Sequence, residues 1–166
     1  MRGAVLTTLG LGALLACAAC SIEQRTDRDA DAVPSTRRQI IQPEGVARLP
    51  VFSSAVRSGG LIFLSGQLGA LPGVMPPELV EGGIEAETRQ TMDNIIAVLA
   101  AADATLADVV KCTIFLADID DYAAMNAVYL EYFPTDPPAR SAVAGSGLAL
   151  GAVVEIECIA AVPEDA

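Results

Sequence analysis

The 166-residue sequence contains no histidine and no tryptophan, and aromatic residues make up only 4% of it. Without histidine the chain cannot form a Ser-His-Asp triad, a Cys-His pair or a histidine-ligated metal site. Any acid–base catalysis must therefore come from carboxylates, tyrosines, lysine, the backbone or water.

Basic residues are scarce as well. Ten Lys and Arg stand against 21 Asp and Glu, so the net charge is −11. A surface this acidic repels phosphate backbones, and we therefore expect no nucleic-acid partner. The hydrophobic share of 52% nevertheless supports a sizeable core, and the length suits one domain with appendages.

A largely apolar run lies at the N-terminus, from Ala4 to Ala19, and follows Met1-Arg2-Gly3. A basic start, a short apolar segment and small residues before a cysteine are typical of a secretory signal, and the run is short for a membrane span. Residues 1–20 are therefore predicted to be a signal peptide with a lipobox. A plain cleaved signal is the alternative.

Two cysteines compete as the lipidation site. Leu14-Leu15-Ala16-Cys17 resembles a bacterial lipobox, and Ala18-Ala19-Cys20 offers good small residues before the second cysteine. Neither Cys17 nor Cys20 is followed by the aspartate that favours inner-membrane retention. We therefore expect an exported protein on the periplasmic side, held at the outer membrane by a lipid anchor.

Beyond the signal, residues 21–42 are polar, mixed in charge and without a period, which indicates a flexible tether. Residues 43–166 form the predicted domain. Cys112 and Cys158 each fall on the apolar side of a predicted strand, where buried structural thiols are the favoured interpretation. A disulfide between them stays open at this point.

The periodicity of the domain predicts an α+β fold. Residues 51–56 and 61–68 form a predicted hairpin and 71–83 a loop, followed by a helix at 84–102 and a strand at 109–116. A second helix starts near Asp118 and ends at Pro134, and the last strands are 139–143 and 152–160. The order ββαβαββ predicts a mixed sheet with two helices on one face.

The last two strands are unusual because each carries charge in its middle. Arg140 is one of the two basic residues that follow Arg89, and Glu155 and Glu157 share one face of their strand. With Lys111 and Thr113, these carboxylates are expected on the face that the helices leave open, near the lone arginine. The simpler interpretation is an exposed face with a stray Arg–Glu pair.

Several motifs occur in one order along the chain. They are Phe63-Leu64-Ser65-Gly66-Gln67, Thr88-Arg89-Gln90 with Asn94, Asp108 to Leu116, Asn126-Ala127-Val128-Tyr129, Pro138-Ala139-Arg140-Ser141-Ala142-Val143 and Glu155-Ile156-Glu157. Together they resemble the RidA/YjgF family of imine deaminases over roughly residues 49–162, and six motifs in register make the resemblance specific.

The resemblance implies a chorismate-mutase-like homotrimer with clefts between subunits, where short-lived 2-imino acids are hydrolysed to 2-keto acids and ammonia without a metal or organic cofactor. Arg140 matches the residue that binds the substrate carboxylate, and Glu155 the carboxylate that activates water; Glu157 is the weaker candidate. The remaining matched positions around the substrate are Phe52, Ser65, Gly66, Asn126 and Ala142.

The chain also departs from the family pattern. Phe52 stands where many active members have tyrosine, Gly145-Ser146-Gly147 replaces a bulkier segment, and Ala149 stands where proline is usual. A wider or looser pocket is therefore expected. The rival functions are a non-catalytic module of the same fold that binds small carboxylates, and a structural or chaperone-like trimer, against which the presence of both Arg140 and Glu155 argues.

Overall fold

The computed structural model describes residues 38–44, 46 and 50–163. The predicted signal peptide with Cys17 and Cys20 lies outside the described residues. Of the predicted tether, the described part includes a short strand, β1 (Gln39–Ile41), which pairs with the hairpin that follows. The sheet therefore includes three residues that precede the predicted domain boundary at residue 43.

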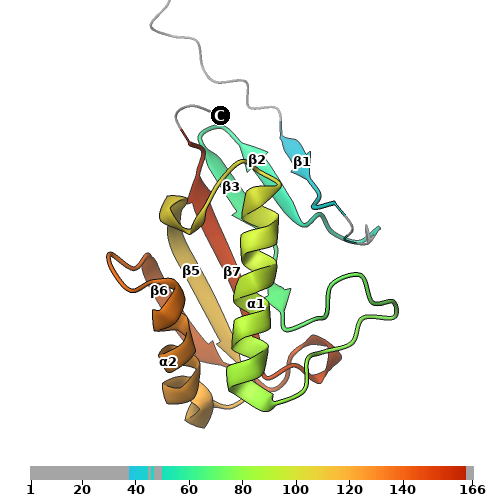
Figure 1. The fold of residues 1–166 in the computed structure, drawn as a ribbon, viewed down its shortest axis with the longest axis vertical. Helices are drawn as coiled ribbons and strands as arrows, with labels where there is room; N and C mark the ends of the chain where they lie inside the picture. Colours follow the sequence, from blue (N-terminus) through green and yellow to red (C-terminus); the bar gives the residue numbers. More distant parts are fainter. Residues whose placement is uncertain (1–37, 45, 47–49, 164–166) are drawn as a thin grey trace, which may run out of the picture. The chain divides into compact units, whose positions relative to one another are not determined.

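The remaining strands form one mixed sheet (Figure 1). They are β2 (Ala55–Ser58), β3 (Leu61–Leu64), β4 (Gln67–Leu68), β5 (Val109–Leu116), β6 (Ala139–Ala144) and β7 (Val154–Ala161). The strand order is β1-β2-β3-β7-β5-β6, with β4 also paired to β7. Every pairing is antiparallel except β5 with β6. The predicted mixed sheet is confirmed.

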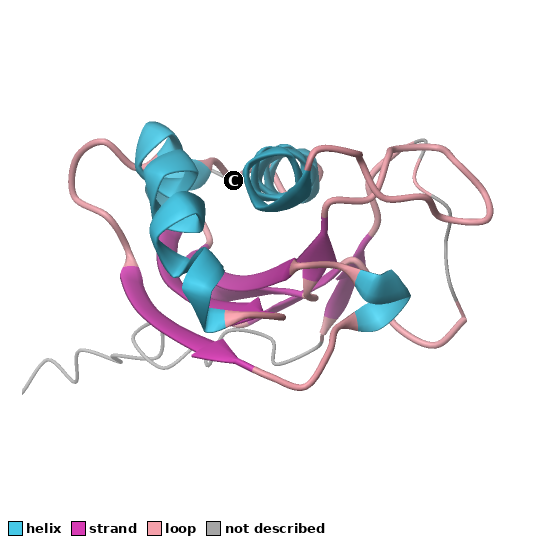
Figure 2. Ribbon diagram, turned by 90° about the horizontal axis from the view of Figure 1, so that it is seen from below, coloured by secondary structure: helices cyan, strands magenta, loops and turns pink. Residues whose placement is uncertain are grey.

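Within the described residues, two α-helices, α1 (Gly83–Ala100) and α2 (Tyr122–Tyr132), lie on the same side of this sheet (Figure 2). Short 3-10 turns at Leu106–Asp108, Ile119–Asp121 and Ala149–Gly151 connect the elements. None of these helices has the length and apolar character needed to cross a membrane. The predicted α+β class with both helices on one face is confirmed.

The sequence spacing explains which side of α1 is buried. Thr88, Met92, Ile95 and Leu99 recur every three or four residues, and all four are fully buried. Ile96 lies one position off this stripe and is 39% exposed. In α2, Met125 is fully buried.

Strand β7 alternates as predicted, and it defines the two faces of the sheet. Val154, Ile156 and Cys158 are buried beneath the helices, and Glu155 and Glu157 lie on the opposite side. We call this opposite side the open face; it carries Lys111, Thr113, Glu155 and Glu157. Lys111 Nζ donates a hydrogen bond of 2.7 Å to Ser141 Oγ there.

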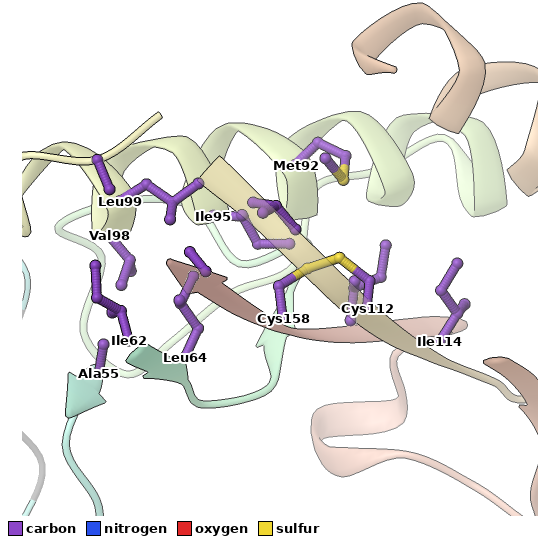
Figure 3. Packing of buried hydrophobic residues seen from close by; sticks show 14 of the residues in the cluster. Ala55, Ile62, Leu64, Met92, Ile95, Val98, Leu99, Cys112, Ile114 and Cys158 are labelled. Carbon is purple, nitrogen blue, oxygen red and sulfur yellow. A yellow bond between two sulfur atoms is a disulfide. The ribbon is translucent and has the colours of Figure 1, made fainter. Parts of the chain in front are cut away.

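Cys112 and Cys158 form a disulfide in the middle of the core (Figure 3). They sit directly opposite each other on β5 and β7, which brings their Cα atoms to 4.1 Å. The predicted burial is confirmed, but the favoured free thiols are wrong because the register pairs the two residues. Closing a loop with a sequence separation of 46 stabilises the fold by about 4 kcal/mol through chain entropy.

The predicted strand at 61–68 is broken into β3 and β4 by Ser65 and Gly66. The Ser65 hydroxyl donates to Ser53 O at 2.7 Å, and the Ser65 amide donates to Ser54 O at 3.0 Å. The backbone at this break is therefore tied to the segment before β2, and Gly66 is half-buried beside the Glu155 side chain of β7. This break positions part of the candidate site.

Candidate active site

The Glu155 carboxyl group lies against the backbone of Gly66. A Cβ atom added at residue 66 would overlap Glu155 Oε1, so only glycine leaves room for the carboxylate. The strand register also fixes Glu155, because it lies opposite Leu68 of β4 and Phe115 of β5. The position of the Glu155 carboxyl group therefore depends on a glycine at residue 66 and on the pairing of β7 with β4 and β5.

Burial raises the pKa of Glu155 above its ordinary value, and the negative charge of Glu157 raises it further. Within the described part of the chain, no ion pair reaches Glu155. A carboxylate in this state takes and releases protons nearer to neutral pH than an exposed one. Glu157 itself lies opposite Thr113 and is exposed.

Arg140 lies on β6, and residues of α2 hold its guanidinium group. Nη1 donates to Asn126 Oδ1 at 2.6 Å and Nη2 donates to the Tyr122 hydroxyl at 2.9 Å. The guanidinium carbon also lies 5.0 Å from the ring centre of Tyr129 and 5.6 Å from that of Tyr122. Among the described residues, two of the five N–H groups are used in this way.

The surroundings of Arg140 also shift the pKa values of the two neighbouring tyrosines, Tyr122 and Tyr129. Hydrogen bonding to Asn126 and the charge of Arg140 lower the pKa of Tyr122. Burial raises the pKa of Tyr129 to about 12, so this hydroxyl stays protonated. The Tyr129 hydroxyl is buried, and among the described residues it has no hydrogen-bond partner.

The expectation that Arg140 lies near the two carboxylates on one face is wrong within a single chain. Cys112 pairs with both Arg140 and Cys158, so Arg140 shares the helix-covered face with these buried cysteines. Glu155 is three residues from Cys158, and an odd separation places it on the other face. The relative register of three strands, rather than any one strand, decides this.

The predicted site residues therefore fall into two groups. The arginine half contains Arg140, Asn126 and Ala142, which lies two residues along β6 on the same face. The side-chain oxygen of Asn126 accepts a hydrogen bond from Arg140, so Asn126 acts on the arginine rather than on the backbone.

The glutamate half contains Glu155, Gly66, Ser65 and Phe52. The hydroxyl of Ser65 is engaged with Ser53 O, and Phe52 is 50% exposed. Within one chain the structure does not bring this half and the arginine half together.

Two residues of the arginine half were missed by sequence reasoning. Tyr129 is buried, whereas Tyr122 is 38% exposed and its hydroxyl accepts a hydrogen bond from Arg140. The spacing of Tyr122, Asn126 and Tyr129 by four and three residues places them on one helix face. That spacing was the signal that could have found them.

Acidic and thiol side chains offer no metal site in the described part of the chain, where no group of three or more of them could hold an ion.

Comparison with known proteins identifies the family to which the chain is similar. The family model described as Endoribonuclease L-PSP matches residues 45–162. Protein mmf2, mitochondrial, of Schizosaccharomyces pombe is 48% identical over 113 residues, which cover 66% of this chain and 86% of that protein. A protein of Capra hircus named 2-iminobutanoate/2-iminopropanoate deaminase is 42% identical over 124 residues, covering 75% of this chain and 89% of that protein.

The fold agrees with the same family. The crystal structure of RidA from an Antarctic Psychrobacter species superimposes with a TM-score of 0.69 and 40% sequence identity, covering 75% of this chain and 99% of that one. A family model that spans most of the chain, relatives above 40% identity and a matching fold all point the same way. The chain therefore belongs to the RidA/YjgF family.

Proposed function

We propose that this protein hydrolyses reactive 2-imino acids, and the enamines that tautomerise to them, to 2-keto acids and ammonia. Two oriented side chains support this proposal most directly. The Arg140 guanidinium is held by Asn126 and Tyr122, and the partly desolvated Glu155 carboxyl group lies against Gly66. The relative named 2-iminobutanoate/2-iminopropanoate deaminase supports the same reaction.

The proposed site is shared between subunits of a homotrimer. Arg140 and Glu155 lie on opposite faces of one sheet, so one chain cannot present both to a small substrate. Strand β6 is the last strand of the sheet order, and Arg140 therefore lies at an edge that a second chain can approach. The open face also carries exposed apolar side chains such as Phe63 and Val143, which suits it to contact another subunit.

In this proposal Arg140 binds the substrate carboxylate. A guanidinium offers two parallel N–H groups that match the two carboxylate oxygens and keeps its charge at any relevant pH. Asn126 and Tyr122 fix the plane of the group before the substrate arrives, which lowers the entropic cost of binding. The imine carbon is thereby held at a defined distance from the anchor.

Glu155 of the adjoining subunit acts on water. The imine reacts as its protonated form, the iminium ion; the Glu155 carboxylate takes a proton from the water whose oxygen bonds to the iminium carbon, which gives a neutral carbinolamine. The proton then passes to the amino nitrogen. The carbon–nitrogen bond breaks, ammonia leaves, and loss of the hydroxyl proton forms the keto group. The raised pKa of Glu155 favours this proton transfer in both directions.

One alternative stays in competition, a non-catalytic module that binds small carboxylates. Phe52 favours it, because residue 52 brings no hydroxyl group to steady water or substrate. An endoribonuclease activity, which the description of the family model names, is disfavoured by the net charge of −11.

The deciding experiment generates 2-iminopropanoate and 2-iminobutanoate with an amino-acid oxidase and traps the surviving imine with semicarbazide. We expect catalytic amounts of the protein to shorten the lifetime of both imines. An unchanged lifetime, together with measurable binding of pyruvate, would establish the binding module instead.

We further propose that the chain is exported and lipid-anchored through Cys17 or Cys20. The support is the sequence context alone, since both residues lie outside the described part of the chain. Mass spectrometry of the N-terminal peptide is expected to find a diacylated cysteine as the first residue. An unmodified Met1 would overturn the anchor.

A further inference from the structure

An apolar pocket of about 230 Å³ adjoins the glutamate half of the site. It lies between α1, β4 and the loop that follows β4, with Phe52 and Leu150 also in its wall. The loop is held as a hairpin, because the Leu71 amide donates to Glu78 O and the Val80 amide to Gly69 O, both at 2.8 Å. Met75, at the end of this hairpin, is 58% exposed and lines the pocket.

The lining chemistry selects an apolar ligand group. Among the residues that the structure describes, no charged side chain lines the pocket, and the polar side chains there already have partners in the protein. Asn94 Nδ2 donates to Leu68 O at 3.0 Å and to Ala70 O at 2.8 Å. Ser54 Oγ donates to the side-chain oxygen of Gln42, and the side-chain amide of Gln67 donates to Ser65 O.

The pocket shares its wall with the carboxylate position. Gly66 lines the pocket and is also the residue against which Glu155 lies. Leu68, another lining residue, is the direct strand partner of Glu155. A molecule with its reacting carbon near Glu155 therefore has an apolar recess within reach of its side chain.

We propose that this pocket receives the side chain of the substrate and makes the protein selective for 2-imino acids with large apolar side chains, branched aliphatic or aromatic. This inference rests on the proposed function. A cavity of ~150 Å³ lined by aliphatic and aromatic side chains holds a benzene molecule. The present pocket is larger, and a methyl or ethyl side chain would leave most of it unfilled.

The expected selectivity follows from apolar burial. Each methylene group transferred from water into an apolar site improves binding about fourfold. The imine of leucine carries three more side-chain carbons than the imine of alanine, so its kcat/KM is expected to exceed that of the alanine imine by at least about tenfold.

Ala97 offers a clean way to fill the pocket. It lines the pocket from α1, yet it is exposed, so a larger side chain enters the recess without disturbing the core. Ala100, on the same helix, is also exposed and does not line the pocket. Ala97→Phe and Ala100→Phe therefore add the same volume at two exposed positions of one helix, of which only the first lines the pocket.

The test measures kcat/KM for the leucine and alanine imines in the wild type and both variants, with thermal melting as the check on folding. We expect the leucine-to-alanine ratio to fall at least about tenfold in Ala97→Phe and to stay at the wild-type value in Ala100→Phe. A wild type without preference, or a ratio unchanged by Ala97→Phe, would overturn the assignment.

Binding of two 2-keto acids, pyruvate and 4-methyl-2-oxopentanoate, separates this inference from the proposed reaction. If no imine is hydrolysed but calorimetry shows tighter binding of the larger keto acid, lost in Ala97→Phe, the deaminase fails and the pocket assignment stands. If the imines are hydrolysed without regard to side chain, the deaminase stands and the pocket assignment fails.

Discussion

The two halves of the candidate site are built in different ways. The arginine half is assembled from side chains: two hydrogen bonds and two aromatic rings hold Arg140. The glutamate half is assembled by the backbone, because Glu155 is placed by strand pairing and by the space that Gly66 leaves.

Their electrostatic states differ as well. Arg140 is stabilised as a cation by neutral polar groups and aromatic faces, whereas Glu155 is desolvated beside a second carboxylate and its pKa is raised. Within the described part of the chain, neither group forms an ion pair. The Arg140 guanidinium is held in a fixed orientation, whereas the Glu155 carboxylate has no positive charge beside it among the described residues. We therefore expect the arginine half of one subunit to face the glutamate half of another.

The largest expected effects come from replacing the side chain of Arg140 or of Glu155. Arg140→Lys keeps the charge but loses the two-pronged geometry, and Glu155→Gln loses the base; each should lower kcat/KM by about 10²–10⁴-fold. Glu155→Gln should retain binding of a keto acid, measured by calorimetry. Near-normal turnover in either variant would remove that residue from its proposed role.

Mixing the two inactive variants tests the division into halves directly. In trimers assembled at random from Arg140→Lys and Glu155→Gln chains, about a quarter of the clefts would combine an intact Arg140 with an intact Glu155 from another chain. Activity should therefore return to about a quarter of the wild-type value after co-expression. Continued inactivity of verified hybrid trimers would place both halves of each site in one chain.

A smaller effect is expected at the backbone that shapes the glutamate half. Gly66→Ala places a methyl group where Glu155 Oε1 lies, and the displaced carboxylate should lower kcat/KM about 100-fold. Gly60→Ala is the control, because a Cβ there meets no atom within 4 Å. Equal losses in the two variants would show that the effect does not arise from the contact with Glu155.

Substituting the residues that hydrogen-bond to Arg140 should lower activity less than substituting Arg140 itself. Asn126→Ala removes one hydrogen bond to the guanidinium group, worth about 1.5–3 kcal/mol for a charged donor, and should raise KM by about tenfold or more with a smaller change in kcat. Tyr122→Phe removes the other bond and keeps the ring over which Arg140 lies. A loss confined to kcat would contradict a positioning role in carboxylate binding.

The smallest effect is a shift in pH dependence. Activity requires ionised Glu155, so it is lost as the pH falls through the pKa of that group. Burial is the larger cause of the raised pKa and Glu157 the smaller, so Glu157→Gln should move the acidic limb of the kcat/KM profile to lower pH. A limb that stays in place, or moves to higher pH, would show that Glu157 does not act on Glu155.

Much of the fold followed from local patterns. The strand at 109–116 has the predicted bounds, the alternation of β7 was predicted residue by residue, and both helices lie within a few residues of their expected positions. The first hairpin was less accurate, because the strand predicted at 51–56 begins only at Ala55 and the one at 61–68 is broken at Gly66. At that break Ser65 is hydrogen-bonded to Ser53 and Ser54, a long-range contact that the local pattern does not reveal.

The sequence by itself determined the chemistry of the candidate site: a lone arginine, two glutamates on one side of a strand, and no histidine. Alternation within a strand is a local property, and a single sequence carries it completely. The tertiary structure decided how the strands are aligned with one another. That alignment joins Cys112 to Cys158, places Arg140 beneath α2 and leaves Glu155 on the open face. A shift of one residue would exchange the faces, and this register is set by pairing between segments far apart in the chain.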